Sequence, residues 1–150
     1  MKYETYKKLA PAALGKVKAD LIFKNCSIVD VFTGELVEGN VGVKDGIIIG
    51  VSRSLQGKKE IDLNGACIAP GFIDAHLHLE STMVAPAELV ATAAACGTTT
   101  FIVDPHEACN VSGADGIQYI LDQTEKSNAN VFVMLPSCVP ATTDLYGKLV

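Results

Sequence analysis

The residues best suited to chemistry are two histidines, His76 and His78, at the end of an apolar stretch. Side chains two positions apart on a β-strand point to the same side, so the two imidazoles can converge on one point. Asp74 falls on that side by the same rule. Neutral imidazole is a preferred ligand of zinc, iron and related ions. The spacing therefore predicts a metal-binding pair at His76 and His78, with Asp74 as a further candidate. The alternative is two histidines satisfied by backbone carbonyl groups.

A second polar cluster, Asp104-Pro105-His106-Glu107, follows the next apolar stretch. A simple turn would explain Asp104 as a capping residue and Pro105 as a strand breaker. It would leave His106 and Glu107 unexplained. We therefore predict a functional role for His106 or Glu107. Asp104, His106 and Glu107 are candidates for binding the metal or supporting its ligands.

Glu80 is the residue most informative about the class of substrate. It lies two positions beyond His78 and is expected to face the same cavity. A carboxylate there repels anionic substrates and favours a ligand rich in N–H donors. The alternative is an exposed loop glutamate.

A third segment, residues 136–140, makes Ser137 a second candidate for substrate binding. The alternative is a loop stiffened by its two prolines. Cys138 is not predicted to be a nucleophile, because no dedicated base stands beside it in the sequence.

An alternation of strands and helices from Gly71 onward must position these side chains. The segments 72–77, 98–103 and 131–135 read as buried strands, and two helices lie between them. Pro86 suits the first turn of the first helix and Gly97 its end; the second is predicted over 113–127. This α/β pattern predicts a parallel sheet or barrel, in which polar residues at the carboxyl ends of the strands form the site.

The first 70 residues have a different rhythm. They predict a short helix ending near Gly15, followed by an antiparallel β domain whose turns contain Asp-Gly and Asn-Gly pairs. The predicted strands are 20–24, 27–31, 36–43, 46–51, 59–63 and 67–69. The chain thus divides into a β domain, 1–70, and an α/β domain, 71–150.

Length limits how much of a barrel the chain can hold. A closed (β/α)8 barrel takes roughly 250 residues, and about eighty follow the β domain. Fewer than three of the eight units fit. A barrel would therefore be incomplete here, with only its opening present.

Composition excludes several classes of protein. The formal charge of −5 argues against a nucleic-acid-binding surface, and no apolar run reaches membrane-spanning length. The N-terminus has no apolar core of the signal-peptide kind. Five scattered cysteines without a Cys-x-x-Cys pair favour a reduced cytoplasm and no structural disulfide.

The run from Gly71 to His78 resembles the signature of the amidohydrolase superfamily. A longer combination is similar to the adenine deaminase family in particular. It comprises His76-Leu77-His78-Leu79-Glu80-Ser81-Thr82-Met83, Gly97-Thr98-Thr99-Thr100, Asp104-Pro105-His106-Glu107 and Ser137-Cys138-Val139-Pro140-Ala141. The likeness extends from about Ala19 to Ala141.

The resemblance implies a small N-terminal β-sandwich domain joined to a (β/α)8 barrel, and conversion of adenine to hypoxanthine and ammonia in purine salvage. It implies a binuclear centre, commonly manganese or iron with zinc as a further option, to which His76 and His78 contribute. The other ligands and the proton-transferring carboxylate would follow Val150, so this segment alone is expected to be inactive. A cytoplasmic homo-oligomer is the accompanying expectation.

Two alternatives stay open at this stage. Cyclic-amide hydrolases of the dihydroorotase or hydantoinase kind carry an arginine where Glu80 stands, which counts against them. A truncated, non-catalytic remnant is favoured if the reading frame stops at Val150.

Overall fold

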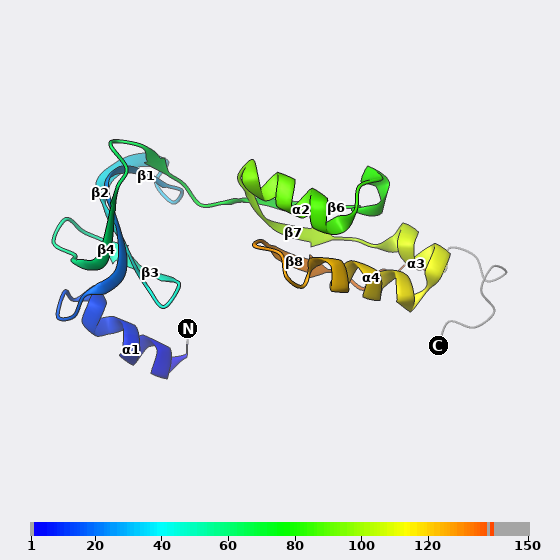
Figure 1. The fold of residues 1–150 in the computed structure, drawn as a ribbon, viewed down its shortest axis with the longest axis horizontal. Helices are drawn as coiled ribbons and strands as arrows, with labels where there is room; N and C mark the ends of the chain where they lie inside the picture. The colour runs from blue at the N-terminus through cyan, green and yellow to red at the C-terminus, as the bar shows by residue number, and fades with distance from the viewer. Residues whose placement is uncertain (1, 138, 140–150) are drawn as a thin grey trace. The chain divides into compact units, whose positions relative to one another are not determined.

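The computed structural model describes residues 2–137 and residue 139 (Figure 1). The chain divides into two compact units, Met1–Pro70 and Gly71–Val150. The four cysteines among the described residues, Cys26, Cys67, Cys96 and Cys109, are free. Cys138 lies outside the described residues.

The first unit is one helix and one five-stranded sheet. Its elements are α1 (Tyr3–Ala13), β1 (Ala19–Asp30), β2 (Glu35–Lys44), β3 (Ile47–Val51), β4 (Gly57–Asp62) and β5 (Cys67–Ile68). The strand order is β3-β2-β1-β4, and β5 also pairs with β1. Within this unit the described residues form one sheet, so the β-sandwich stays a prediction.

The β2–β3 hairpin has the tight turn that the sequence predicts. Asp45 and Gly46 both have positive φ, 51° and 74°, as a type I′ turn requires. Asn64 and Gly65 also form a turn with positive φ. That turn joins β4 to β5, which both pair with β1, so the predicted hairpin there is wrong.

Two predictions for this sheet are corrected. The strands predicted at 20–24 and 27–31 are one strand, β1, which runs through a register shift between Phe23 and Cys26. The sheet is mixed and not antiparallel, because β4 and β5 pair with β1 in parallel. The segment 52–56 connects β3 at one edge to β4, across β2 and β1. This crossover carries no turn signal, but its Leu55 is buried with Ile22 and Ala19.

The second unit alternates strands with helices and contains the candidate site. Its elements are β6 (Phe72–Leu77), the 3-10 turn η1 (Glu80–Thr82), α2 (Pro86–Ala95), β7 (Thr98–Val103), α3 (His106–Ser112), α4 (Ala114–Thr124) and β8 (Asn130–Val133). The strands are parallel in the order β6-β7-β8, which confirms the predicted parallel sheet.

One apolar core joins this sheet to its helices. It consists of Leu79, Val90, Phe101, Val103 and Ile120, which are all nearly inaccessible to solvent. Val90 comes from α2 and Ile120 from α4. Phe101 and Val103 come from β7, and Leu79 lies between β6 and η1. Phe132 pairs with Ile102 on the opposite face and is 58% exposed. Among the described residues the sheet is therefore covered on one face only. The strand 98–103 had been predicted to be buried on both faces.

The helices differ from the prediction in one respect that matters for the site. Helix α2 begins with Pro86 and is followed by Gly97 at φ 106°, as predicted. The predicted second helix, 113–127, is α4, but a separate helix, α3, precedes it. Asp104 and Pro105 are typical turn residues, so this short helix was not predicted from the sequence. Gly113, with φ 59° and ψ −140°, separates the two helices.

Candidate metal centre

The candidate site lies where β6 and β7 end side by side. The backbone N–H of Asp104 donates to the carbonyl oxygen of Leu77 at 2.9 Å, which joins the two strand ends. The residues after each strand are therefore neighbours, as parallel pairing predicts. The structure brings together His76 in β6, His78 just after β6 and Asp104 just after β7.

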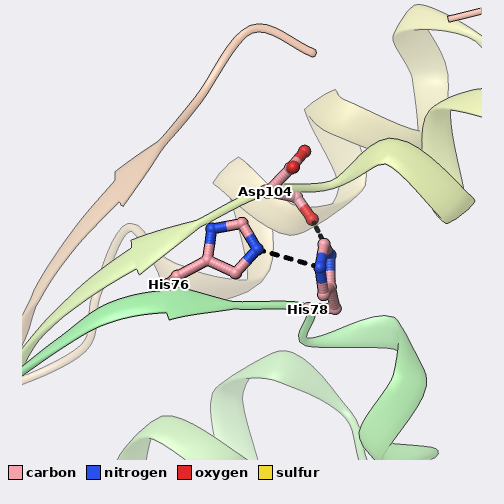
Figure 2. A group of neighbouring side chains, drawn as sticks. All are labelled: His76, His78 and Asp104. Carbon is pink, nitrogen blue, oxygen red and sulfur yellow. Dashed lines mark hydrogen bonds between the residues drawn. The ribbon is translucent and has the colours of Figure 1, made fainter. Parts of the chain in front are cut away.

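The two histidines point their rings at each other (Figure 2). Their Nε2 atoms are 3.1 Å apart. The Nδ1 atom of His78 lies 2.8 Å from the carbonyl oxygen of Asp104. A carbonyl oxygen can only accept, so His78 Nδ1 donates, and in the neutral ring Nε2 carries the free lone pair. This is how a metal-binding histidine is commonly held.

The separation of the two nitrogens fits a shared metal ion. Two nitrogens bound tetrahedrally at roughly 2.0–2.1 Å lie about 3.3 Å apart, close to the observed 3.1 Å. The same separation allows His76 Nε2–H to donate to His78. The alternative stated from the sequence was that backbone carbonyl groups satisfy the histidines. It applies to His78 Nδ1, and the Nε2 atom of His78 stays available to bind a metal ion.

A second group of possible ligands adjoins the first. His78, His106 and Glu107 each offer an atom within 4.8 Å of the others, as do His76, His78 and Asp104. Glu107 Oε2 lies 3.4 Å from His78 Nδ1. The rings of His78 and His106 meet edge to face, with centroids 4.5 Å apart. The two groups share His78.

Buried polar atoms without a hydrogen-bond partner gather at this edge. Within the described part of the chain they are Glu80 Oε2, Asp104 Oδ1, His106 Nδ1 and Glu107 Oε2. Leaving such an atom unsatisfied costs about 1–3 kcal/mol. Three of the four are carboxylate oxygens, the ligand type of hard divalent cations, and the fourth is an imidazole nitrogen. The donor set therefore fits a divalent metal ion.

Electrostatics at the site favour positive charge. The hydrogen bond to the Asp104 carbonyl raises the pKa of His78 above its ordinary value, and the carboxylates of Glu107, Asp104 and Glu80 add to this effect. Burial would raise the pKa of Glu107, but hydrogen bonds involving Glu80 and Ser81, with the charge of His106, outweigh burial and lower it. A divalent cation would meet the same negative field.

Asp74 does not join either group of possible ligands. Its Oδ1 accepts a hydrogen bond from the backbone N–H of His76 at 3.2 Å. Between Asp74 and Leu77, β6 advances three residues while β7 advances only two, from Phe101 to Val103. Such a bulge interrupts strict alternation, which the i, i+2 rule assumed.

Glu80 is held by the backbone of helix α3. Its Oε1 accepts hydrogen bonds from the N–H groups of Glu107 and Ala108, both at 3.1 Å. Sequence reasoning missed Ser81, whose Oγ donates to Glu107 Oε1 at 3.0 Å. The only signal was its position beside Glu80. Ser137 is exposed and belongs to neither group of possible ligands.

The amidohydrolase family matches residues 67–149, more than half of the sequence. This chain belongs to the amidohydrolase family.

Several similar proteins are adenine deaminases. The chain is 57% identical over 135 residues to an adenine deaminase of Desulfitobacterium hafniense, covering 90% of this chain and 24% of that protein. It is 50% identical over 131 residues to an adenine deaminase of Clostridium acetobutylicum, covering 87% and 23%. The chain thus spans about a quarter of the length of the curated relatives that it matches.

Solved structures support the fold. The N-acyl-D-glutamate deacylase of Bordetella bronchiseptica, complexed with zinc and a phosphonate inhibitor, aligns with a TM-score of 0.56 at 19% identity, over 80% of this chain and 30% of that one. A structure of D-aminoacylase aligns with a TM-score of 0.55 at 18% identity, over 79% and 30%. In the described part of the chain, no helix has the length and apolar character needed to span a membrane.

Proposed function

We propose that the complete protein hydrolyses adenine to hypoxanthine and ammonia, with a metal centre that includes His76 and His78. The observation that carries this proposal is the convergence of the two Nε2 atoms at 3.1 Å beside unpartnered carboxylate oxygens. The identity of about half or more to adenine deaminases supports the choice of substrate. The reaction adds water at the carbon that bears the amino group and releases ammonia, so atoms balance without a further reactant.

A divalent cation would supply an activated water at neutral pH, because coordination lowers the pKa of water toward 7. His76 and His78 would hold it through Nε2, and the Asp104 carbonyl oxygen orients the His78 ring. Asp104, His106 and Glu107 are further ligands or support them. We propose a binuclear centre with Mn2+ or Fe2+, with Zn2+ as the other option.

Substrate recognition is assigned to carboxylates at the same edge. Glu80 uses Oε1 on the backbone of α3, while its Oε2 has no partner. That oxygen can accept a hydrogen bond from a ring N–H of a purine. Ser137 is retained as a second substrate contact. Cyclic-amide substrates that carry a carboxylate are not favoured, because Glu80 and Glu107 would repel them.

The remaining architecture is also proposed. The sheet β6-β7-β8 forms the first strands of a (β/α)8 barrel, and the sheet of the first unit is part of a β-sandwich. The two units correspond to domains 1–70 and 71–150. The chain spans only about a quarter of the length of its relatives, so we propose that the segment alone is inactive and that the rest of the protein supplies further ligands. We place the enzyme in the cytoplasm as a homo-oligomer that acts on a free purine base.

The test is an adenine deamination assay on protein from the complete reading frame, loaded with Mn2+. We expect release of ammonia and hypoxanthine, lost on His76→Ala or His78→Ala substitution. Glu88→Ala, at an exposed position on α2, is the matched control and keeps full activity. A folded, metal-loaded protein without adenine turnover would overturn the proposal and direct attention to cyclic amides.

A further inference from the structure

Glu80 connects two parts of the site that are distant in sequence. It lies in η1, just after β6, and its Oε1 accepts from two consecutive backbone N–H groups, those of Glu107 and Ala108. Both belong to the first turn of α3, where N–H groups have no acceptor within the helix. Glu80 therefore supplies the hydrogen-bond acceptor for this first turn. The residue that precedes the helix, Pro105, offers no side-chain cap.

The same turn of α3 is held by other contacts as well. Ser81 Oγ donates to Glu107 Oε1 at 3.0 Å. On the far side, Gly116 of α4 approaches the backbone of Ala108 so closely that a Cβ there would lie 2.8 Å from the Ala108 carbonyl carbon. Ala108 is thus fixed between the Glu80 carboxylate and α4.

This turn carries two side chains of the candidate centre. Glu107 Oε2 lies 3.4 Å from His78 Nδ1, and the His106 ring meets the His78 ring edge to face. A movement of the turn by an ångström would change both contacts. The position of α3, and not only the identity of its residues, sets the surroundings of His78.

We propose that Glu80 is a positioning residue, whose carboxylate Oε1 holds the first turn of α3 so that His106 and Glu107 lie beside His78. This role is separate from the substrate contact proposed for Oε2, and its importance for catalysis rests on the proposed function. The relevant property is a hydrogen-bond acceptor, and the charge is secondary. Glutamine keeps one acceptor oxygen and alanine keeps none.

The experiment is amide hydrogen exchange on the metal-loaded protein from the complete reading frame, in wild type, Glu80→Ala, Glu80→Gln and Glu88→Ala. In Glu80→Ala, exchange at Glu107 and Ala108 should rise about ten- to a hundredfold. The N–H of Cys109, which donates to the Pro105 carbonyl oxygen, should change much less. Glu80→Gln should keep most of the protection, and Glu88→Ala should match wild type.

A second measurement extends the test to the metal centre. Titration with Mn2+ should show weaker binding in Glu80→Ala than in Glu80→Gln. Equal exchange at Glu107 and Ala108 in Glu80→Ala and wild type would overturn the proposal. So would equal loss in the alanine and glutamine variants, because then charge and not the acceptor is what matters. A comparable rise at Cys109 would indicate general unfolding of α3 and would also overturn it.

The two proposals fail separately. Exchange and Mn2+ binding do not depend on which substrate is turned over. If wild type does not deaminate adenine, the proposed function falls, while the exchange pattern still decides the role of Glu80.

Discussion

The close contact between α3 and α4 allows a substitution at a residue that is not itself a candidate metal ligand to be worked out in detail. Gly116 is buried in α4, and a Cβ added there would lie 2.8 Å from the carbonyl carbon of Ala108 and 3.3 Å from its Cβ. The first of these is shorter than real Cβ contacts, and its partner is backbone that cannot rotate away. Gly116→Ala must therefore push the two helices apart, by somewhat less than an ångström.

The expected cost combines two opposing effects. Overpacking of this kind destabilises by about 1–3 kcal/mol. Replacing glycine by alanine inside a helix returns roughly 0.5–1 kcal/mol. The net loss of stability is therefore roughly 0–2.5 kcal/mol, centred near 1 kcal/mol. Displacement of the turn that carries His106 and Glu107 should also lower activity, and shifts of that size cost up to about a hundredfold.

The assay is urea unfolding of the metal-loaded protein from the complete reading frame, together with adenine turnover. Gln118→Ala, at an exposed position on the same helix, is the control and should stay within about 0.5 kcal/mol of wild type. A Gly116→Ala protein as stable and as active as wild type would refute the reasoning, because the helices would then have room that the structure does not show.

Two further predictions concern charge and metal. Hydrogen bonds from Lys44 and Lys58, and from the Asp45 backbone, hold the pKa of Asp20 well below its ordinary 3.8. The contribution of Asp20 to folding stability is therefore complete above pH 3.8 and is lost as the pH falls toward the lower pKa of the folded state. Asp20→Asn should unfold more readily than wild type at pH 7. The difference in stability between the two proteins should shrink as unfolding is measured toward pH 2. A gap independent of pH would contradict this. Removal of divalent metal by a chelator should abolish adenine turnover, and Mn2+ should restore it, whereas restoration in a His76→Ala, His78→Ala double variant would contradict the assignment.

Much of the site could be predicted from the sequence because it depends on local rules. His76 lies near the end of one strand, His78 directly follows it, and Asp104 follows the next parallel strand, so the pairing of neighbouring parallel strands places all three at one edge. The Asp45-Gly46 turn and the helix between Pro86 and Gly97 were predictable for the same reason, since each depends on the conformational preference of one or two residues.

Features that depend on contacts between distant segments could not be predicted. The parallel pairing of β4 with β1 follows from a crossover whose only marker is the burial of Leu55. Helix α3 was missed because its first turn is completed by Glu80, 27 residues away from Glu107. The bulge in β6 moved Asp74 out of the cluster, and it follows from pairing with β7. These three features depend on tertiary contacts, and no local sequence pattern indicates them.

The central claim is that His76 and His78 share a divalent metal ion, and anomalous X-ray diffraction at the manganese edge tests it most directly. Crystals of the Mn2+-loaded protein from the complete reading frame should show an anomalous peak at roughly 2.0–2.3 Å from both Nε2 atoms. Absence of a peak there, with the two rings hydrogen-bonded to each other at about the present 3.1 Å, would contradict the account.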